Sequence, residues 1–262
     1  MTAYRQYRKP HRYKKRKPIF RKKFLAFGFL VLTAACAVFY GLFLGKIFWA
    51  EKIIINGEQK ITKEEIEFLV SKKLENTVLF FKTKSILAVD GGQIKEDILN
   101  AFPRISEAKV TKDLFDTISV EITERTASAL WCENESCFLL DDRGVIFEEA
   151  PLDSGLMVIE ADQSPGELIL GGTVLPSDKI MQILAIKSKL AETLQISIVS
   201  VKLFDERLDV ETTEGWMIRF NLKGDLDWQM TELKLTLEKQ ISPEKRRELE
   251  YIDLRFRSIY YK

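Results

Sequence analysis

The sequence predicts an α+β protein in which one transmembrane helix precedes two folded domains. The first domain is expected to have the order β-α-α-β-β, and the second to be a β-rich mixed domain with two covering helices. Three observations predict this fold class: an uncharged apolar run near the N-terminus, a compact set of two helix and three strand patterns after it, and a longer stretch in which short strand patterns predominate.

The apolar run between Lys23 and Lys46 is FLAFGFLVLTAACAVFYGLFLG, 22 residues without a charge. A helix rises about 1.5 Å per residue and needs about 20 residues to cross the hydrocarbon core of a bilayer. A lysine and three bulky residues follow at 46–49, where a cleaved signal peptide would carry small residues. Residues 24–48 are therefore predicted to be an uncleaved, single-pass helix in contact with the lipid bilayer.

The charges are distributed unevenly about this run. No Asp or Glu precedes Glu51, whereas 12 of the 40 Lys and Arg residues do. The positive-inside rule then places the basic tail, residues 1–23, in the cytoplasm and the part from about Ala50 onward outside the membrane. That outer part has 28 basic against 39 acidic residues, a net charge of about −11, which argues against nucleic-acid binding there. Aromatic residues within the tail would also fit nucleic-acid contact, but orientation and attraction to anionic lipid explain its charge.

The first domain, residues 50–124, is predicted from local signals that agree with one another. Thr62 and Glu65 have the spacing of a capping box at the start of an amphipathic helix, and a second helix stops at Pro103. Apolar residues then alternate with polar ones on both sides of a turn at 113–116, as in two antiparallel strands with one buried face. In order, the elements are a strand at 52–57, helices at 62–74 and 93–102, and strands at 108–112 and 117–122.

The second domain, residues 125–257, is predicted from short strand patterns, and residues 258–262 form the C-terminal end. Helices at about 177–193 and 226–241 have one apolar face each and are expected to cover the sheet. The strands are expected at 129–132, 137–140, 145–147, 156–159, 198–204, 208–211 and 216–222, with a last strand over 251–256.

Two cysteines of this domain, Cys132 and Cys137, flank four polar residues in the pattern of a tight hairpin. Cross-strand neighbours at the mouth of a hairpin can form a disulfide bond, and an oxidising exterior would permit it. Two buried thiols on facing strands would give the same pattern, so both possibilities stay open. Two cysteines without a histidine do not make a convincing zinc site, and no metal site is predicted.

An enzymatic function has little support in the sequence. The only histidine, His11, lies in the predicted cytoplasmic tail and cannot serve a centre outside the membrane. A Ser-Lys hydrolase, or a nucleophile at Cys132 or Cys137, remains formally possible, but no basic partner at a defined spacing supports either. We therefore predict no catalytic residue, no cofactor and no small-molecule substrate.

Several short motifs follow one another along the chain from the apolar run to the last strand. They are Ile55-Asn56-Gly57, the segment 76–80, Phe102-Pro103-Arg104-Ile105, the segment 117–120 leading to Glu124-Arg125, Ala129-Leu130-Trp131, the segment 140–147, and Ile252-Asp253-Leu254-Arg255-Phe256. In this order and spacing the chain resembles the FtsQ/DivIB family of bacterial cell-division proteins. The resemblance implies a POTRA domain at 50–124, an FtsQ-type β domain after it, and a location in the inner (cytoplasmic) membrane at the division septum. It further implies a non-enzymatic scaffold that helps to regulate septal peptidoglycan synthesis.

The resemblance also implies where a partner binds. In the family, a late strand of the β domain pairs with an extended segment of FtsB, which associates with FtsL, and the matching positions here are Phe256 and Ser258. We add Ile259 and Tyr260, because they are expected to prolong the same strand, whose exposed edge could take another chain by β-augmentation. Apart from the resemblance, an ordinary edge strand protected by nearby Arg and Lys residues explains the same pattern.

Glu124 and Arg125 fall where the two predicted domains meet. A carboxylate paired with a guanidinium at this point could fix the angle between the domains, although a solvated surface pair would look the same in the sequence.

Two other functions fit an anchored exterior without catalytic groups. A POTRA-bearing chaperone or secretion component would also bind extended peptides by strand addition. A wall-binding membrane protein would need a carbohydrate groove lined by exposed aromatic residues, and the sequence does not decide between these alternatives and the scaffold.

Overall fold

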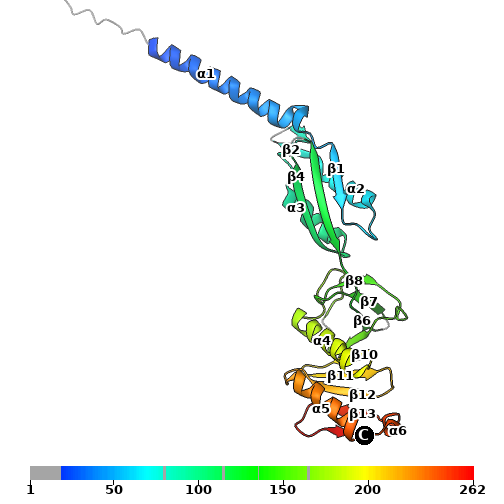
Figure 1. Ribbon diagram of the computed structural model, residues 1–262. Helices are drawn as coiled ribbons and strands as arrows, with labels where there is room; N and C mark the ends of the chain where they lie inside the picture. The colour runs from blue at the N-terminus through cyan, green and yellow to red at the C-terminus, as the bar shows by residue number, and fades with distance from the viewer. Residues whose placement is uncertain (1–18, 79–80, 114–115, 135, 164–165) are drawn as a thin grey trace, which may run out of the picture.

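The computed structural model describes residues 19–78, 81–113, 116–134, 136–163 and 166–262. The chain is elongated, with a long helix at one end, the C-terminus at the other, and two domains between them (Figure 1). The predicted α+β class, with an apolar helix ahead of two domains, is confirmed. Most of the predicted basic tail, residues 1–18, lies outside the described residues.

Helix α1 (Ile19–Phe39) continues as a π-helical turn, η1 (Tyr40–Leu44), and then stops. The stretch Lys23–Phe43 has a mean hydropathy of 2.2 and is long enough to cross a membrane, and it is the one such helix among the described residues. Gly45 is extended, with φ −70° and ψ 144°, and a separate 3-10 turn, η2 (Lys46–Phe48), follows. The helix expected over 24–48 is therefore too long at its C-terminal end.

The first domain contains a three-stranded sheet in the order β1-β5-β4. Strand β1 (Lys52–Asn56) runs parallel to β5 (Thr117–Glu124), which is antiparallel to β4 (Ile105–Asp113). Helices α2 (Lys63–Leu74) and α3 (Gly91–Ala101) share a buried core with this sheet. The β-α-α-β-β order and the Thr62–Glu65 capping box are confirmed. The hairpin of β2 (Asn76–Val78) and β3 (Phe81–Thr83), between the two helices, was not predicted.

The second domain is built on a nine-stranded sheet in the order β14-β13-β12-β11-β10-β9-β6-β7-β8. Helices α4 (Ser177–Leu194) and α5 (Leu226–Lys239) are the two expected helices, and α6 (Pro243–Arg246) is an unpredicted short one. The strands are β6 (Ala129–Glu133), β7 (Ser136–Leu140), β8 (Ile146–Glu149), β9 (Val158–Ala161), β10 (Ile198–Leu203), β11 (Arg207–Thr212), β12 (Met217–Asn221), β13 (Tyr251–Asp253) and β14 (Tyr260–Tyr261).

The two faces of this sheet differ in character because successive side chains of a strand point to opposite faces. On one face, Leu208 and Val210 of β11 and Ile218 and Phe220 of β12 are buried in one cluster with the apolar residues of α4 and α5. The opposite face carries the alternate residues, such as Asp209 and the other polar and charged side chains between them. The helices cover only the apolar face, so the polar face and the β14 edge of the sheet lie outside the core.

The end of the membrane helix is hydrogen bonded directly into the first domain. The hydroxyl of Thr83 donates to the carbonyl oxygen of Phe43, and Ser85 Oγ donates to that of Leu42 at 2.9 Å. Both hydroxyl residues are buried. In the chain that follows, the N–H of Ala50 donates to Lys84 O at 2.9 Å. The last carbonyls of a helix have no partner within it, so these side chains satisfy them and leave no free linker between helix and domain.

Candidate docking edge

Strand β14 is one edge of the nine-stranded sheet and pairs antiparallel with β13. The N–H of Lys262 donates to Tyr251 O at 3.2 Å, and the N–H of Tyr251 donates to Lys262 O at 3.4 Å. In an antiparallel pair, residues alternate between those bonded to the neighbouring strand and those facing away from it. The N–H and C=O of Tyr261, adjacent to Lys262, therefore face away from β13 and can bond a further strand.

The residues that we expected on one continuous strand lie on both sides of a reversal of the chain. Phe256 and Ser258 are in the bend between β13 and β14, Ile259 packs against the core, and Tyr260 begins β14. The expected strand over 251–256 ends at Asp253. The expectation that Ile259 and Tyr260 prolong that strand is wrong, because β14 returns antiparallel along its edge.

The side chain of Asp253 explains the reversal. Its carboxylate accepts a hydrogen bond from the backbone N–H of Arg255 at 3.1 Å, which closes an Asx-type turn. The guanidinium of Arg255 adds Nε–Oδ1 at 2.9 Å and Nη2–Oδ2 at 2.6 Å. Burial alone would raise the pKa of Asp253, but the hydrogen bonds and the charge of Arg255, with a smaller contribution from the charge of Arg219, outweigh it and lower this pKa. The turn is thus held by an ionised, buried carboxylate.

Three aromatic side chains surround the open edge. Phe256, Tyr260 and Tyr261 are 51%, 57% and 44% exposed, and the rings of Phe256 and Tyr260 meet edge to face at 6.0 Å between centroids. Sequence reasoning missed Tyr261, whose backbone offers the free bonding groups. The signal that could have found it is Asp253-Leu254-Arg255, an aspartate two residues before an arginine, which permits the turn that makes Tyr260 and Tyr261 a separate strand.

Glu124 and Arg125 do not pair with each other, which corrects the expected junction pair. Glu124 Oε1 accepts hydrogen bonds from the backbone N–H groups of Gln59, Lys60 and Ile61 at 2.7, 2.9 and 3.1 Å, within the first domain. Partial burial opposes ionisation of Glu124, but these three donors prevail and lower its pKa. Glu124 therefore fixes the loop before α2 and does not reach the second domain.

Arg125 is the residue that joins the two domains. Its Nε donates to Pro103 O in the first domain at 3.0 Å, and its Nη1 bonds Asp141 Oδ2 in the second at 2.5 Å. The two side chains are only 13% and 4% exposed. Asp141 Oδ1 also accepts from the backbone N–H of Arg143 at 3.0 Å and of Val145 at 2.8 Å. One buried carboxylate thus organises a turn of the second domain around an arginine held by the first.

Two further ion pairs cross the same junction. Arg143 Nη2 bonds Glu107 Oε1 at 3.0 Å, and Arg104 pairs with Glu148. The guanidinium of Arg104 also lies over the ring of Phe147, 5.4 Å from its centroid. At this junction each domain therefore contributes both acidic and basic side chains to the contacts between them.

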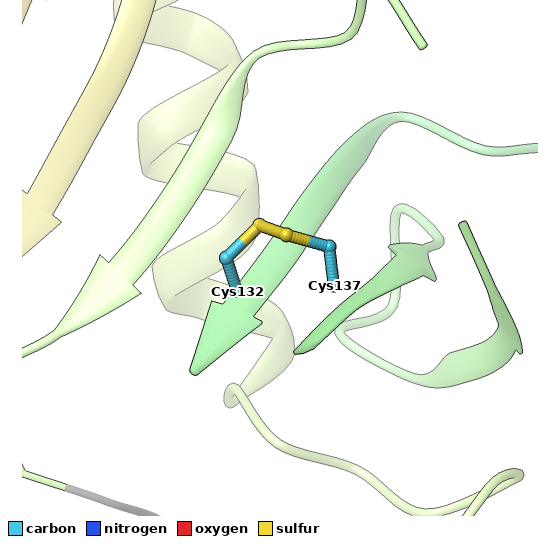
Figure 2. The surroundings of a disulfide bond; sticks show 2 residues. All are labelled: Cys132 and Cys137. Atoms are coloured by element: carbon cyan, nitrogen blue, oxygen red, sulfur yellow. A yellow bond between two sulfur atoms is a disulfide. The ribbon is translucent and has the colours of Figure 1, made fainter. Parts of the chain in front are cut away.

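Cys132 and Cys137 form a disulfide bond across the β6–β7 hairpin, where they are directly opposed in register (Figure 2). The bond closes a hairpin whose turn includes Asn134 with φ 49°, a left-handed conformation that asparagine tolerates. The disulfide holds the β6–β7 pair, which neighbours β8 and the domain junction.

Changing both Cys132 and Cys137 to serine should lower the free energy of unfolding by about 2 kcal/mol, because a sequence separation of 5 makes a small closed loop. Denaturant unfolding of the full chain in detergent micelles measures it. Wild type treated with a reducing agent should lose the same amount. A double variant as stable as oxidised wild type would contradict a stabilising role for the bond.

Within the described ranges, no group of three or more His, Cys, Asp or Glu residues could hold a metal ion. The edge of β14 presents the outward N–H and C=O of Tyr261 beside exposed aromatic side chains, and such groups can bond an added strand.

Comparison with known proteins gives two adjoining matches. Residues 48–125 match the family model described as POTRA domain, FtsQ-type, and residues 129–255 match Cell division protein FtsQ/DivIB, C-terminal. Together the two models cover most of the part of the chain that follows the apolar helix.

Three similar proteins are each named Cell division protein FtsQ. The one from Streptomyces bingchenggensis (strain BCW-1) is 26% identical over 185 residues, 69% of this chain and 66% of that protein. The one from Novosphingobium aromaticivorans is 28% identical over 100 residues, 38% of this chain and 28% of its own length. The one from Bradyrhizobium diazoefficiens is 29% identical over 96 residues, 37% of this chain and 25% of that protein. The match therefore spans just under two thirds of the first relative and about a quarter of the other two.

Proposed function

Because the chain belongs to the FtsQ/DivIB family of bacterial cell division proteins, we propose that it is a non-enzymatic scaffold of the division machinery. The basic tail lies in the cytoplasm, α1 crosses the inner (cytoplasmic) membrane once, and the two domains stand outside it at the division septum. There the chain binds division proteins of FtsB and FtsL type and helps to regulate septal peptidoglycan synthesis.

The observation that carries the proposal is the open edge of β14. Natural sheets usually cover or charge their edges, since an unpaired edge accepts other strands. Here the outward N–H and C=O of Tyr261 lie among three exposed aromatic side chains. An extended segment that adds a strand to β14 bonds Tyr261 and covers the rings, which gives both the ladder bonds and the apolar contact of β-augmentation.

The position of the edge also supports the proposal. The edge is at the C-terminal end of the molecule, at the opposite end from α1 (Figure 1). The ion pair of Lys262 Nζ with Glu250 Oε2, 2.8 Å, joins β14 to the residue preceding β13 and leaves the outward side of the strand uncovered. A partner anchored in the same membrane therefore reaches β14 only with an exterior segment long enough to extend past the first domain (Figure 1).

Replacing Tyr261 by proline should weaken binding of the extended exterior segments of the cognate FtsB-type and FtsL-type proteins. Proline and alanine at this position both remove the ring, but only proline removes the outward N–H. We expect Tyr261→Pro to bind about tenfold more weakly than Tyr261→Ala, the effect of one lost hydrogen bond. Titration of the full chain in lipid nanodiscs, followed by fluorescence anisotropy of a labelled segment, measures the difference.

Two results would count against the proposal. If the wild-type chain binds neither segment, the partner assignment fails. If the proline and alanine variants bind equally, the partner does not use the β14 ladder. Ser258→Pro does not test this point, because Ser258 lies in the bend and outside the ladder.

One observation favours a second function, that of a POTRA-bearing chaperone or secretion component. Strand β4 is also an edge of its sheet, and a hollow of about 680 Å³ beside it is lined by residues of α3, β4 and β5, including Gly91, Leu99 and Val110. A chaperone would bind extended peptides of unrelated sequence there. Competition by such peptides, with no preference for the division-protein segments, would favour this function over the scaffold.

A further inference from the structure

A row of residues in direct register crosses the face of the nine-stranded sheet that lies opposite α4 and α5. The signs of its charges alternate from strand to strand, and the row ends in the docking edge. Its members are Glu160 of β9, Lys202 of β10, Asp209 of β11, Arg219 of β12, Asp253 of β13 and Tyr260 of β14. Oppositely charged residues directly opposite each other on neighbouring strands stabilise the pairing.

Asp209 and Asp253, the two acids of the row closest to the docking edge, are poorly solvated, so each needs positively charged partners. Asp209 is 15% exposed and has Arg207 Nε at 3.0 Å from its Oδ1. Burial raises the pKa of Asp209 against the pull of Arg207, Arg219 and Arg255, and the charge of Asp253 raises it further. The two carboxylates therefore repel each other across the strand that separates them.

Arg219 occupies that separating strand and is the register partner of both acids. Its guanidinium lies over the ring of Tyr251, 4.3 Å from the centroid, which restricts the side chain. Its carbonyl oxygen accepts the N–H of Leu254 at 2.9 Å, at the first residue after β13. Arg207 and Arg255 each serve mainly one acid, whereas Arg219 lies between the two.

We propose that Arg219 is a positioning residue for the docking edge: as the cation shared by Asp209 and Asp253, it keeps the turn that presents β14 in its binding geometry. This inference rests on the proposed function of β14. Asp253 holds the turn through four hydrogen bonds from Arg255, and it accepts them fully only when ionised. The charge of Arg219 adds to the hydrogen bonds and the charge of Arg255 in keeping Asp253 ionised beside Asp209, and it does so without contact with the bound strand.

The test compares three variants of the full chain in nanodiscs. Arg219→Met removes the charge but keeps an unbranched apolar chain, and Arg219→Lys restores the charge. Lys202→Met removes another cation of the same row, which faces Asp209 and Glu160 and lies two strands farther from the edge than Arg219. The readouts are hydrogen exchange of the segment 250–262 and the affinity for the labelled FtsB-type segment.

We expect Arg219→Met to speed hydrogen exchange of that segment and to weaken binding about tenfold, mainly through faster dissociation. Arg219→Lys should return both exchange and affinity most of the way to their wild-type values, and Lys202→Met should change neither. Unchanged exchange and affinity in Arg219→Met would overturn the inference. A rise in exchange that extends equally to α4 would also overturn it, because Arg219 would then be a general stability residue. If wild type does not bind, the proposed function fails, and the exchange comparison still decides whether Arg219 holds the edge.

Discussion

Changing Asp141 to alanine should lower the free energy of unfolding of the second domain by about 3–5 kcal/mol, the effect of leaving one member of a buried ion pair alone. Arg125 would keep its bond to the carbonyl oxygen of Pro103 but lose its bond to the carboxylate of Asp141. The backbone N–H groups of Arg143 and Val145 would lose their acceptor as well. Chemical unfolding monitored by hydrogen exchange of β7 and β8 measures the loss.

The matched control is Glu107→Ala, which breaks the exposed pair with Arg143 at the same junction. Its effect should be much smaller, since solvent screens exposed pairs. The combined change of Arg125→Met with Asp141→Leu should recover part of the stability, because no unpaired charge is then buried. Equal losses for Asp141→Ala and Glu107→Ala would show that burial does not govern this junction.

Changing Gly144 to alanine should lower the free energy of unfolding by about 3 kcal/mol or more, combining a left-handed backbone with a steric clash. Gly144 has φ +82°, and an added Cβ would lie 1.9 Å from the carbonyl oxygen of Leu175. The Gly144 carbonyl accepts the N–H of Val174 at 2.9 Å, so the two segments could not separate without losing that bond. Thermal unfolding of the full chain in detergent micelles measures the effect.

Gly215 is a suitable control because its φ is +91° but nothing lies within 4 Å of an added Cβ. Gly215→Ala should therefore cost only the conformational part, about 1 kcal/mol. A similar loss of unfolding free energy at both positions would mean that the close approach of Gly144 to Leu175 adds nothing to the effect of the alanine substitution.

Local signals accounted for most of the fold. The Thr62–Glu65 capping box lies within one helical turn, and the strands of both domains follow the alternation of apolar and polar residues, so neither depends on distant contacts. The last strand was predicted too long. Its residues 254–256 continue the alternating pattern, but the carboxylate of Asp253 accepts hydrogen bonds from the backbone and the guanidinium of Arg255, and this turn reverses the chain.

Of the two residues expected to pair at the junction, only Arg125 joins the domains, and neither residue bonds the other. Glu124 bonds groups more than 60 residues earlier in the chain, and Arg125 bonds Asp141, which a sequence read without a fold does not bring near it. The end of the membrane helix was misjudged similarly, because hydropathy does not reveal that Thr83 and Ser85 hold the carbonyls where the helix stops.

The hydrogen bonds from Thr83 and Ser85 to the end of the helix link the first domain to the tilt of the helix in the bilayer. A helix whose apolar length exceeds the local hydrocarbon thickness adapts by tilting. In the proposed topology, a loose linker would absorb that tilt, whereas the bonded end of α1 would pass it to the first domain and, through Arg125 and Asp141, to the second. Bilayer thickness would then affect the height and direction of β14 relative to the membrane surface.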